Sequence, residues 1–348
     1  MEGPERIPTV FDIAREAGVS RGTVDRVLHN RGRFSPETAA RVREAVKRLG
    51  YSANPNASLL ASRKALTLAC LLPSYRDGEY WQLIHQGIKE GIEALEGYGL
   101  KATMFFYDQT DVASFRAQCK AILNGDKPSA VLLNAVFKEE IRTFTVLLEQ
   151  ADIPFAFIDN KVDGLGNFLY VGIDPYRSGQ LGAFLLTVSS APQEIGLVRI
   201  LRDKGHQGDP NEPRRQGFID YISTHFPQCA IQTVFIDPGR PDSILATLKE
   251  FRRKHPDIRH YATTNSRVHL IAPFLALHPE MTAVGFDDLE KNLQALRNGS
   301  VDFLVTHGIL RQAALTVELI GKYLISGTLP GPRNHYVHLD ILHRMNLD

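Results

Sequence analysis

Two sets of polar residues have the types and spacing needed to recognise other molecules. The first set lies in one short stretch and combines hydroxyl, guanidinium, imidazole and amide groups. Its members are Ser20, Arg21, Gly22, Thr23, Asp25, Arg26, His29 and Asn30. Short or hydrogen-bonding side chains on one helical face are suited to the base edges and phosphates of a DNA major groove. The alternative interpretation is the solvated polar face of a helical bundle.

The apolar residues around this first set predict three short helices. Gly18 permits a sharp exit from the first helix, and Ser20 is a suitable N-cap for the second. Ser35 is a suitable N-cap for the third helix, with Pro36 at its first position. The inward-facing residues, in chain order, are Val10, Ile13, Ala14, Ala17, Val24, Val27, Leu28, Ala39, Val42, Val46 and Leu49. Two such helices joined by about three residues that include a glycine predict a helix-turn-helix.

The second set of polar residues follows the ends of predicted strands farther along the chain. Open α/β sheets bind ligands just beyond the carboxyl ends of their strands. Tyrosine and tryptophan rings are suited to the apolar face of a sugar, and polar side chains to its hydroxyl groups. The members are Ser74, Tyr75, Tyr80, Trp81, Asn134 and Asp159, with Asn160 beside them. A strand-end aspartate or asparagine can equally be a helix cap.

Alternating apolar strands and amphipathic helices are expected to position this second set. Uninterrupted apolar runs predict strands covered on both faces of a parallel sheet. The strands are expected in two groups, at Leu66–Pro73, Lys101–Tyr107, Ala130–Ala135, Pro154–Ile158 and Leu169–Ile173, and then at Ile195–Leu201, Ile231–Ile236, His260–Thr264, Ala283–Phe286 and Phe303–Thr306. Helices fill most of the gaps, for example Trp81–Leu95, Val112–Leu123 and Ser243–Lys254. Two successive groups of about five strands predict two similar lobes.

The charge of the chain is concentrated at its N-terminal end. The 348 residues are 43% hydrophobic and 23% charged, which is typical of a globular protein, and the net charge is +1. Residues 1–64 contain 12 Lys and Arg against 7 Asp and Glu, whereas the remainder contains 28 against 32. A small basic domain joined to a mildly acidic one is typical of a DNA-binding module attached to another domain.

Several classes of function lack the residues that they need. Cys70, Cys119 and Cys229 are far apart and suit buried, reduced thiols, and the scattered histidines do not favour a metal site. The chain has no phosphate-binding loop, zinc-protease motif or nucleophile elbow, so we expect no cofactor and no enzymatic activity. No apolar run approaches the length of a membrane span, and the first ten residues lack the layout of a secretory signal. We therefore expect a cytoplasmic protein.

The N-terminal part contains DIAREAGVS, TV-x-RVL, the SPET start of the third helix and LGY, followed by NP-x-A and Leu60. These motifs give it a resemblance to the headpiece of the LacI-type (lactose-repressor-like) transcription regulators. It implies that Asn54, Ala57 and Leu60 belong to a hinge helix in the DNA minor groove, where Leu60 partly unstacks a base step. Asp25 stands where the family commonly has serine, which bears on the operator sequence rather than on DNA binding itself.

The larger part resembles, more loosely, the two-lobed core of the same family, which has a periplasmic-binding-protein-like (type I) fold. The resemblance implies three crossings between the lobes and a small ligand in the cleft. Arg214 in PRRQGF and Asp287 in VGFDD match ligand-binding segments of the family. Asn265 stands where the family has an asparagine–aspartate pair, and His307 where many members have glutamine. The ligand-binding residues implied are Arg214, Asn265, Asp287 and His307.

These expectations divide the chain into a headpiece at 1–52, a hinge helix and linker at 53–65, and a two-lobed core at 66–348. The first lobe is expected at 66–174 with 308–328, and the second at 175–306 with 329–348. The crossings are expected near Asp174–Pro175, near Phe286–Asp288, and around His307 or after Leu329. The fold class is a small all-α helix-turn-helix headpiece plus an α/β two-lobed core with parallel sheets.

The resemblance implies a ligand-responsive, sequence-specific DNA-binding transcription regulator, expected to be a repressor. Its partners would be double-stranded operator DNA, a small effector and a second copy in a homodimer, without a membrane. The side chains favour a sugar, while Arg76, Arg214 and His307 leave room for a sugar acid or a sugar phosphate. A transport-type sugar-binding protein would share the core but need an export signal and no headpiece. An enzyme on a carbohydrate metabolite would need catalytic motifs that are missing.

Overall fold

The computed structural model describes residues 9–28, 34–49, 66–200 and 211–347. The chain divides into two compact units, Met1–Arg63 and Lys64–Asp348. Five of the residues predicted to bind DNA lie outside the described residues, together with the predicted hinge helix at 53–65: His29, Asn30, Asn54, Ala57 and Leu60.

The first unit contains three helices around a small apolar core, as the apolar spacing predicts: α1 (Val10–Ala17), α2 (Arg21–Leu28) and α3 (Pro36–Arg48). Ile13, Val24 and Val42, one from each helix, are fully buried. Gly18 ends α1 with φ 62°, in the left-handed region that favours glycine. The Ser20 hydroxyl accepts a hydrogen bond of 3.2 Å from the Thr23 backbone N–H, which caps α2.

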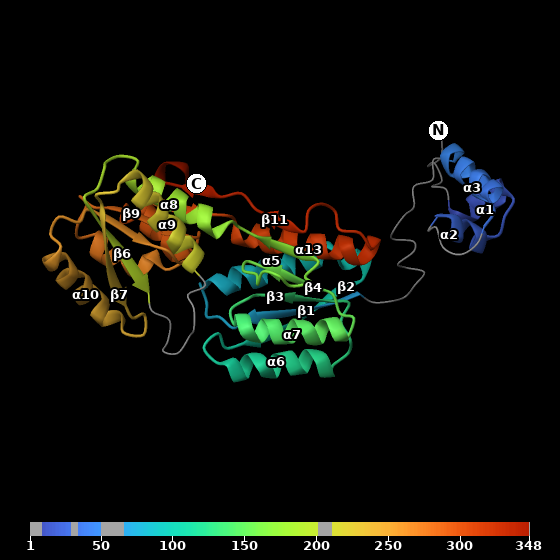
Figure 1. Ribbon diagram of the computed structural model, residues 1–348, viewed down its shortest axis with the longest axis horizontal. Helices are drawn as coiled ribbons and strands as arrows, with labels where there is room; N and C mark the ends of the chain where they lie inside the picture. Colours follow the sequence, from blue (N-terminus) through green and yellow to red (C-terminus); the bar gives the residue numbers. More distant parts are fainter. Residues whose placement is uncertain (1–8, 29–33, 50–65, 201–210, 348) are drawn as a thin grey trace, which may run out of the picture. The chain divides into compact units, whose positions relative to one another are not determined.

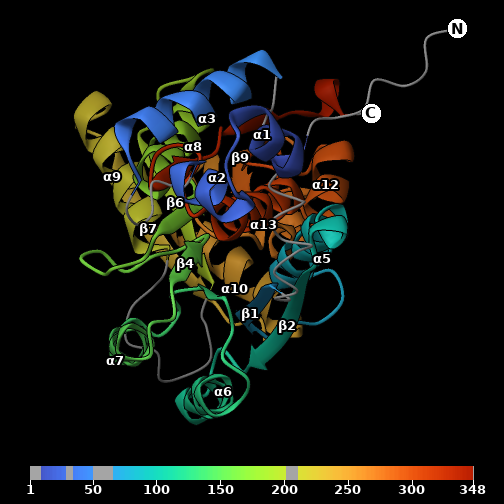
Figure 2. The ribbon, with the colours of Figure 1, turned by 90° about the vertical axis from the view of Figure 1, so that its right-hand side faces the viewer.

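The first lobe of the second unit is a parallel sheet with the strand order β11-β5-β4-β3-β1-β2. Alternate residues of β1 supply two cores, because successive side chains point to opposite faces of a strand. Leu68 and Cys70 pack with α5 and α13, whereas Leu71 packs with α6 and α7. Figures 1 and 2 show α6 and α7 together on one side of the sheet, with α5 on the other. The bounds are β1 Leu66–Pro73, α5 Tyr80–Ala94, β2 Leu100–Tyr107, α6 Val112–Asn124, β3 Ala130–Leu133, α7 Lys138–Gln150, β4 Phe155–Ile158, β5 Leu169–Gly172, α13 Ile309–Ser326 and β11 Asn334–Tyr336.

The second lobe repeats this design, with the strand order β12-β10-β9-β8-β6-β7. Every pairing is parallel except that of the short edge strand β12 with β10. One core lies under α8 and α9, and another under α10, α11 and α12. The bounds are α8 Pro175–Thr187, β6 Glu194–Ile200, α9 Glu212–His225, β7 Ala230–Ile236, α10 Pro241–Lys254, β8 His260–Thr263, α11 Ala272–Leu275, β9 Thr282–Phe286, α12 Glu290–Arg297, β10 Phe303–Thr306 and β12 Asp340–Leu342. The predicted α/β two-lobed class is confirmed.

The chain crosses between the two sheets at three places: between β5 and α8, between β10 and α13, and between β11 and β12. The crossing expected near Phe286–Asp288 is wrong, because β9 and β10 are paired neighbours in one sheet. The assignment of all of 329–348 to the second lobe is also wrong. β11 pairs with β5 of the first sheet, and Leu329 and Val337 pack against the core of the first lobe.

Glycines bring the paired helices of each lobe into close contact. A Cβ at Gly179 of α8 would lie 1.8 Å from the Arg214 carbonyl oxygen of α9. One at Gly217 of α9 would lie 2.0 Å from the Tyr176 carbonyl oxygen. Since real Cβ atoms cannot approach so closely, only glycine allows α8 and α9 to pack at this separation. The backbone that carries Arg214 is therefore fixed by glycine contacts.

The Gly217→Ala protein is expected to lose about 1–3 kcal/mol of unfolding free energy, because α9 must move away from α8. Urea unfolding followed by circular dichroism measures the loss. Gly97→Ala is the matched control, since a Cβ at Gly97 meets nothing within 4 Å. Equal stability of the two variants would contradict the role assigned to Gly217.

Candidate functional site

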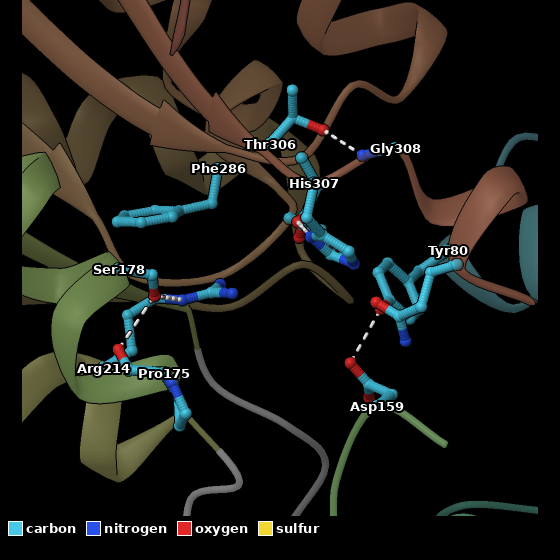
Figure 3. Close-up of polar contacts among 12 residues, drawn as sticks. Tyr80, Asp159, Pro175, Ser178, Arg214, Phe286, Thr306, His307 and Gly308 are labelled. Atoms are coloured by element: carbon cyan, nitrogen blue, oxygen red, sulfur yellow. Dashed lines mark hydrogen bonds and ion pairs between the residues drawn. The ribbon is translucent and has the colours of Figure 1, made fainter. Parts of the chain in front are cut away.

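A cavity of about 300 Å³ lies between the two lobes and is lined by residues from both of them. This volume is at the small end of the range for ligand pockets and suits a small metabolite. The first lobe contributes residues that follow β1 and β4, including Arg76, Tyr80, Trp81, Asp159 and Asn160. The second lobe contributes residues from α9 and from the ends of β8 and β9, including Asn211, Arg214, Asn265, Arg267, His269, Asp287 and Lys291. Figure 3 shows Tyr80 and Asp159 opposite Arg214, with His307 between Arg214 and Tyr80.

Two aspartates occupy equivalent positions in the two lobes. Asp159 follows β4 with φ 67°, and Asp287 follows β9 with φ 69°. Each backbone N–H donates a 2.9 Å hydrogen bond to a carbonyl of the next strand, Val171 for Asp159 and Val305 for Asp287. A left-handed backbone is costly for residues other than glycine, and such strain is concentrated at functional sites. The shared conformation makes these aspartates the centre of the candidate site.

The carboxylate of Asp159 is held by donors from three directions. The Tyr80 hydroxyl donates to Oδ1 at 2.7 Å, and the side-chain amides of Asn134 and Asn160 donate to Oδ2 at 3.3 and 2.9 Å. Burial raises the pKa of Tyr80 well above its usual value, and the charges of Asp159 and Asp287 raise it further. Tyr80 therefore stays protonated and holds the carboxylate of Asp159 in place at the cavity.

Arg214 is buried, and its guanidinium group is held from behind. Nε donates to the Ser178 hydroxyl at 3.0 Å, and one terminal nitrogen donates to the Thr264 carbonyl oxygen at 3.2 Å. The guanidinium carbon lies 4.3 Å from the centroid of the Phe286 ring, which gives a cation–π contact. These contacts leave donors of Arg214 directed toward the cavity (Figure 3).

His307 and Asp287 approach each other without forming an ion pair. Their Nδ1 and Oδ1 atoms are 3.7 Å apart. Burial lowers the pKa of His307 to about 3, and the Arg214 charge acts in the same direction. Burial raises the pKa of Asp287 to about 7, with opposition from Arg214 and support from Asp159. At neutral pH the imidazole of His307 is uncharged and Asp287 is partly protonated, so the two side chains do not form an ion pair.

The His307→Gln protein is expected to resist acid better than the unchanged protein. Folding lowers the pKa of His307, so between pH 6.5 and about 3 only the unfolded chain accepts the proton. The free energy of unfolding therefore decreases as the pH falls through this range. Glutamine has no such proton. Melting temperatures at pH 5 and pH 8 measure the effect, which is a smaller difference between the two values in the variant. An unchanged difference would contradict it.

Six of the ten predicted ligand residues line this cavity: Tyr80, Trp81, Asp159, Arg214, Asn265 and Asp287. Asn134 and His307 contact the two aspartates but do not line the cavity themselves. Ser74 is exposed, and the Tyr75 hydroxyl pairs with His85 while its ring packs on Phe106. Ser74 and Tyr75 therefore do not belong to the cavity. Tyr75 does not line the cavity because its side chain packs against α5 and β2.

Several residues that line or support the cavity were not predicted from the sequence. Arg267, His269 and Lys291 lie a few residues beyond the strand-end positions, so a wider search after β8 and β9 would have found them. Asn292 gave no signal, although its side-chain amide donates to the carbonyls of Ser266, Phe286 and Asp287 and its oxygen accepts from His269. Because this oxygen is an acceptor, His269 carries its proton on Nδ1 and presents Nε2 as an acceptor.

The residues of α2 that are predicted to contact DNA lie largely at the surface. Arg21, Gly22, Asp25 and Arg26 are exposed. The Thr23 hydroxyl accepts from Arg26 at 3.2 Å, which orients that guanidinium. The Arg21 guanidinium carbon lies 4.0 Å from the centroid of the Phe11 ring on α1, and Phe11 is 57% exposed. Phe11 was not predicted to lie at this face, because an aromatic residue at an exposed position of α1 was its only signal in the sequence.

Comparison with known proteins agrees with both parts of the chain. Residues 69–328 match the family described as periplasmic binding protein domain, and residues 9–54 match the bacterial regulatory proteins of the lacI family. The chain belongs to the periplasmic binding protein domain family, with a lacI-family headpiece. The predicted family resemblance is thereby confirmed.

Individual relatives of this lacI-type chain support the same assignment. Catabolite control protein A of Staphylococcus epidermidis is 30% identical over 152 residues, which are 42% of this chain and 42% of that protein, so the match spans less than half of the relative. A solved structure from Bacteroides fragilis, assigned to the LacI transcriptional regulators, has a TM-score of 0.75 and 28% identity and covers 81% of this chain and 98% of its own. A glucose-galactose binding protein from Geobacillus stearothermophilus has a TM-score of 0.67 and 18% identity, covers 82% and 99%, and shares the fold.

Within the described ranges, no helix combines the length and apolar character needed to cross a bilayer. In the same ranges, His, Cys, Asp and Glu side chains form no cluster of three suited to a metal ion. His335 and His343 instead lie in or beside the short edge strands β11 and β12.

Proposed function

We propose that this protein is a sequence-specific DNA-binding transcription regulator whose DNA affinity changes when a small polar metabolite binds between the lobes of its core. The observation that carries the proposal is the combination in one chain of two parts. A headpiece of the lacI family presents an exposed polar face on α2, and a cavity of about 300 Å³ contains two aspartates and Arg214.

A sugar or sugar derivative is the ligand class that the cavity suits. Tyr80 and Trp81 supply aromatic surface, and Asp159, Asn160 and Asn265 supply groups for hydroxyls. A neighbour with the same fold is a glucose-galactose binding protein, and another was solved with D-allose bound. These likenesses support the ligand class by analogy of fold.

The proposed mechanism is linkage between two sites. A ligand that contacts both lobes favours the arrangement in which those contacts form together, and the three crossings allow the lobes to change their relative orientation. A homodimer would place two headpieces on a pseudo-palindromic operator, so a change between the lobes would alter the spacing of the headpieces. The direction of regulation is expected to be repression.

Two rival functions are less well supported. An enzyme acting on a carbohydrate would use the same cavity, but two relatives of this chain are named HTH-type transcriptional regulators. A transport binding protein would need the core alone, and the headpiece then has no purpose. Turnover of a bound sugar by the purified protein would favour the enzyme.

A ligand screen followed by a DNA titration tests the proposal. Ligands that bind only the folded state raise the melting temperature with saturation. Each ligand that does so is then added to a fluorescence anisotropy titration with genomic fragments from upstream of neighbouring genes. The expected result is specific DNA binding that shifts at least fivefold with ligand. Binding of ligand with no effect on DNA affinity would contradict the linkage.

The Arg26→Ala protein is expected to bind DNA more weakly than the unchanged protein. The slope of its log affinity against log salt concentration should be smaller by about one. Arg26 is exposed on α2, and Thr23 orients it. Anisotropy titrations at several salt concentrations measure both quantities. Arg43→Ala, an exposed arginine on α3, is the matched control and should bind as the unchanged protein does. Equal losses in both variants would indicate a general charge effect rather than a face on α2.

A further inference from the structure

The cavity contains four cationic side chains that form no ion pair with a carboxylate of the described residues. Arg214, Arg267 and Lys291 line its second-lobe side, and Arg76 lines its first-lobe side. In the part of the chain that the structure describes, none of these four forms a salt bridge. Neighbouring arginines behave differently, since Arg215 pairs with Glu212 and Arg297 pairs with Glu290. The cavity therefore contains four cationic side chains without an ion-pair partner among the described residues.

The carboxylates of the cavity are engaged by neutral donors instead. Asp159 accepts from Tyr80, Asn134 and Asn160. Glu79 accepts from the Arg76 backbone N–H at 3.0 Å, and Asp77 accepts from the Gln82 side chain at 3.3 Å. Asp287 is held partly protonated at neutral pH by its burial. The carboxylates of the cavity are thus bound by amides and hydroxyls or partly protonated, and none of them forms an ion pair with the four cations among the described residues.

Two of the cations lie near each other on the second lobe. Burial lowers the pKa of His269, and its hydrogen bond to Asn292 raises it. The positive charges of Lys291 and Arg267 are the next largest influences on this pKa, and both lower it. Arg214 is 7% exposed, and a buried guanidinium group without a counter-ion is unfavourable. An anion in the cavity would compensate Arg214, and Arg267 and Lys291 line the same cavity. Arginine binds carboxylates and phosphates through paired hydrogen bonds.

We infer that the ligand carries an anionic group, a carboxylate or a phosphate, which binds Arg214, Arg267 and Lys291 on the second-lobe side. The remainder of the ligand is a polyhydroxylated chain or ring whose hydroxyl groups bind Asp159 and Asn160 on the first-lobe side. The inference rests on the proposed function and narrows its ligand from sugars in general to acidic sugars.

Matched families of compounds test the inference on the full-length protein. Isothermal titration calorimetry compares each neutral sugar of five or six carbons with its sugar acids and its phosphates, for example glucose with gluconate and glucose 6-phosphate. At least one anionic compound is expected to bind tenfold or more tightly than its neutral partner, since hydrogen bonds to charged groups contribute more than neutral ones. Comparing the acid with the phosphate identifies the anion. Inorganic phosphate serves as a competitor for the anion position alone.

Variants separate the anion position from the rest of the cavity. Lys291→Gln is expected to reduce the affinity for the anionic ligand roughly tenfold and to leave the affinity for the neutral sugar unchanged. Lys291 is exposed, so the variant should fold normally. Lys249→Gln, an exposed lysine on α10 that does not line the cavity, is the matched control and should bind as the unchanged protein does.

Each alternative outcome is decisive. If a neutral sugar binds at least as tightly as its acids and phosphates and changes DNA affinity, the inference is wrong and the proposed function stands. If no compound of the panel binds, the inference is wrong, and the specific DNA binding of the headpiece then decides the proposed function separately. If Lys291→Gln and Lys249→Gln weaken the ligand equally, the anion does not lie at the second-lobe cations.

Discussion

The Arg214→Gln protein is expected to bind operator DNA normally and to lose its response to ligand, with ligand affinity reduced about 100-fold or more. Truncating one partner of a buried, hydrogen-bonded charge pair costs several kcal/mol, and each 1.4 kcal/mol is a factor of ten. Arg214 is buried at the cavity, and its bonds to Ser178 and Thr264 fix its direction. Calorimetry measures the ligand affinity, and anisotropy measures DNA binding with and without ligand.

Two companion variants make this result specific. Arg215→Gln changes the next residue of the same helix, which pairs with Glu212 and does not line the cavity, so it should respond normally. Arg214→Lys keeps the charge but loses the planar fork, and it should recover only part of the affinity. Melting temperatures of all three show whether the fold is intact. A normal ligand response in Arg214→Gln would remove Arg214 from the site.

The Asp287→Asn protein is expected to be more stable than the unchanged protein at pH 8 and to bind ligand poorly. The pKa of Asp287 is raised from 3.8 to about 7 in the folded chain, so ionisation of this carboxyl opposes folding. The stability that the protonated carboxyl contributes is complete below pH 4 and is lost as the pH rises through 7. The gain in the variant should therefore be absent at pH 4 and, at pH 8, on the order of 4 kcal/mol at most.

Asparagine is a suitable replacement because it tolerates the left-handed backbone that Asp287 adopts with φ 69°. Urea unfolding at pH 4 and pH 8 measures the stability. The control is Asp126→Asn, an exposed carboxylate that does not line the cavity and should show no such gain. A gain of the same size at both pH values would show that the effect does not come from ionisation of Asp287.

The buried strands could be predicted from the sequence almost to the residue. Leu66–Pro73 and Phe303–Thr306 agree with β1 and β10, because a strand covered on both faces must be apolar throughout. β11 could not be predicted in the same way. Its three residues are polar or exposed, and its membership of the first sheet depends on pairing with β5, which is about 160 residues earlier in the chain.

Only the residues of the candidate site that directly follow a strand could be predicted from the sequence. Asp159 and Asp287 directly follow β4 and β9, and the polar residue at such a position must lie at the edge of the sheet. The direction of a side chain beyond that point depends on tertiary packing. Tyr75 pairs with His85 of α5, and Asn292 bonds three backbone carbonyls from within a helix. Sequence periodicity contains no information on either.

The three crossings between the lobes have a consequence for how ligands bind. Because three segments of chain join the two halves of the cavity, each half is present at a high effective concentration with respect to the other. A ligand that contacts both lobes therefore behaves as a chelator, whose second contact forms without a second loss of translational freedom. The separate pieces of such a ligand, a polyol and a small anion, should each bind far more weakly than the joined molecule. A cell that contains many sugars and many anions would then trigger the protein only with a compound that is both.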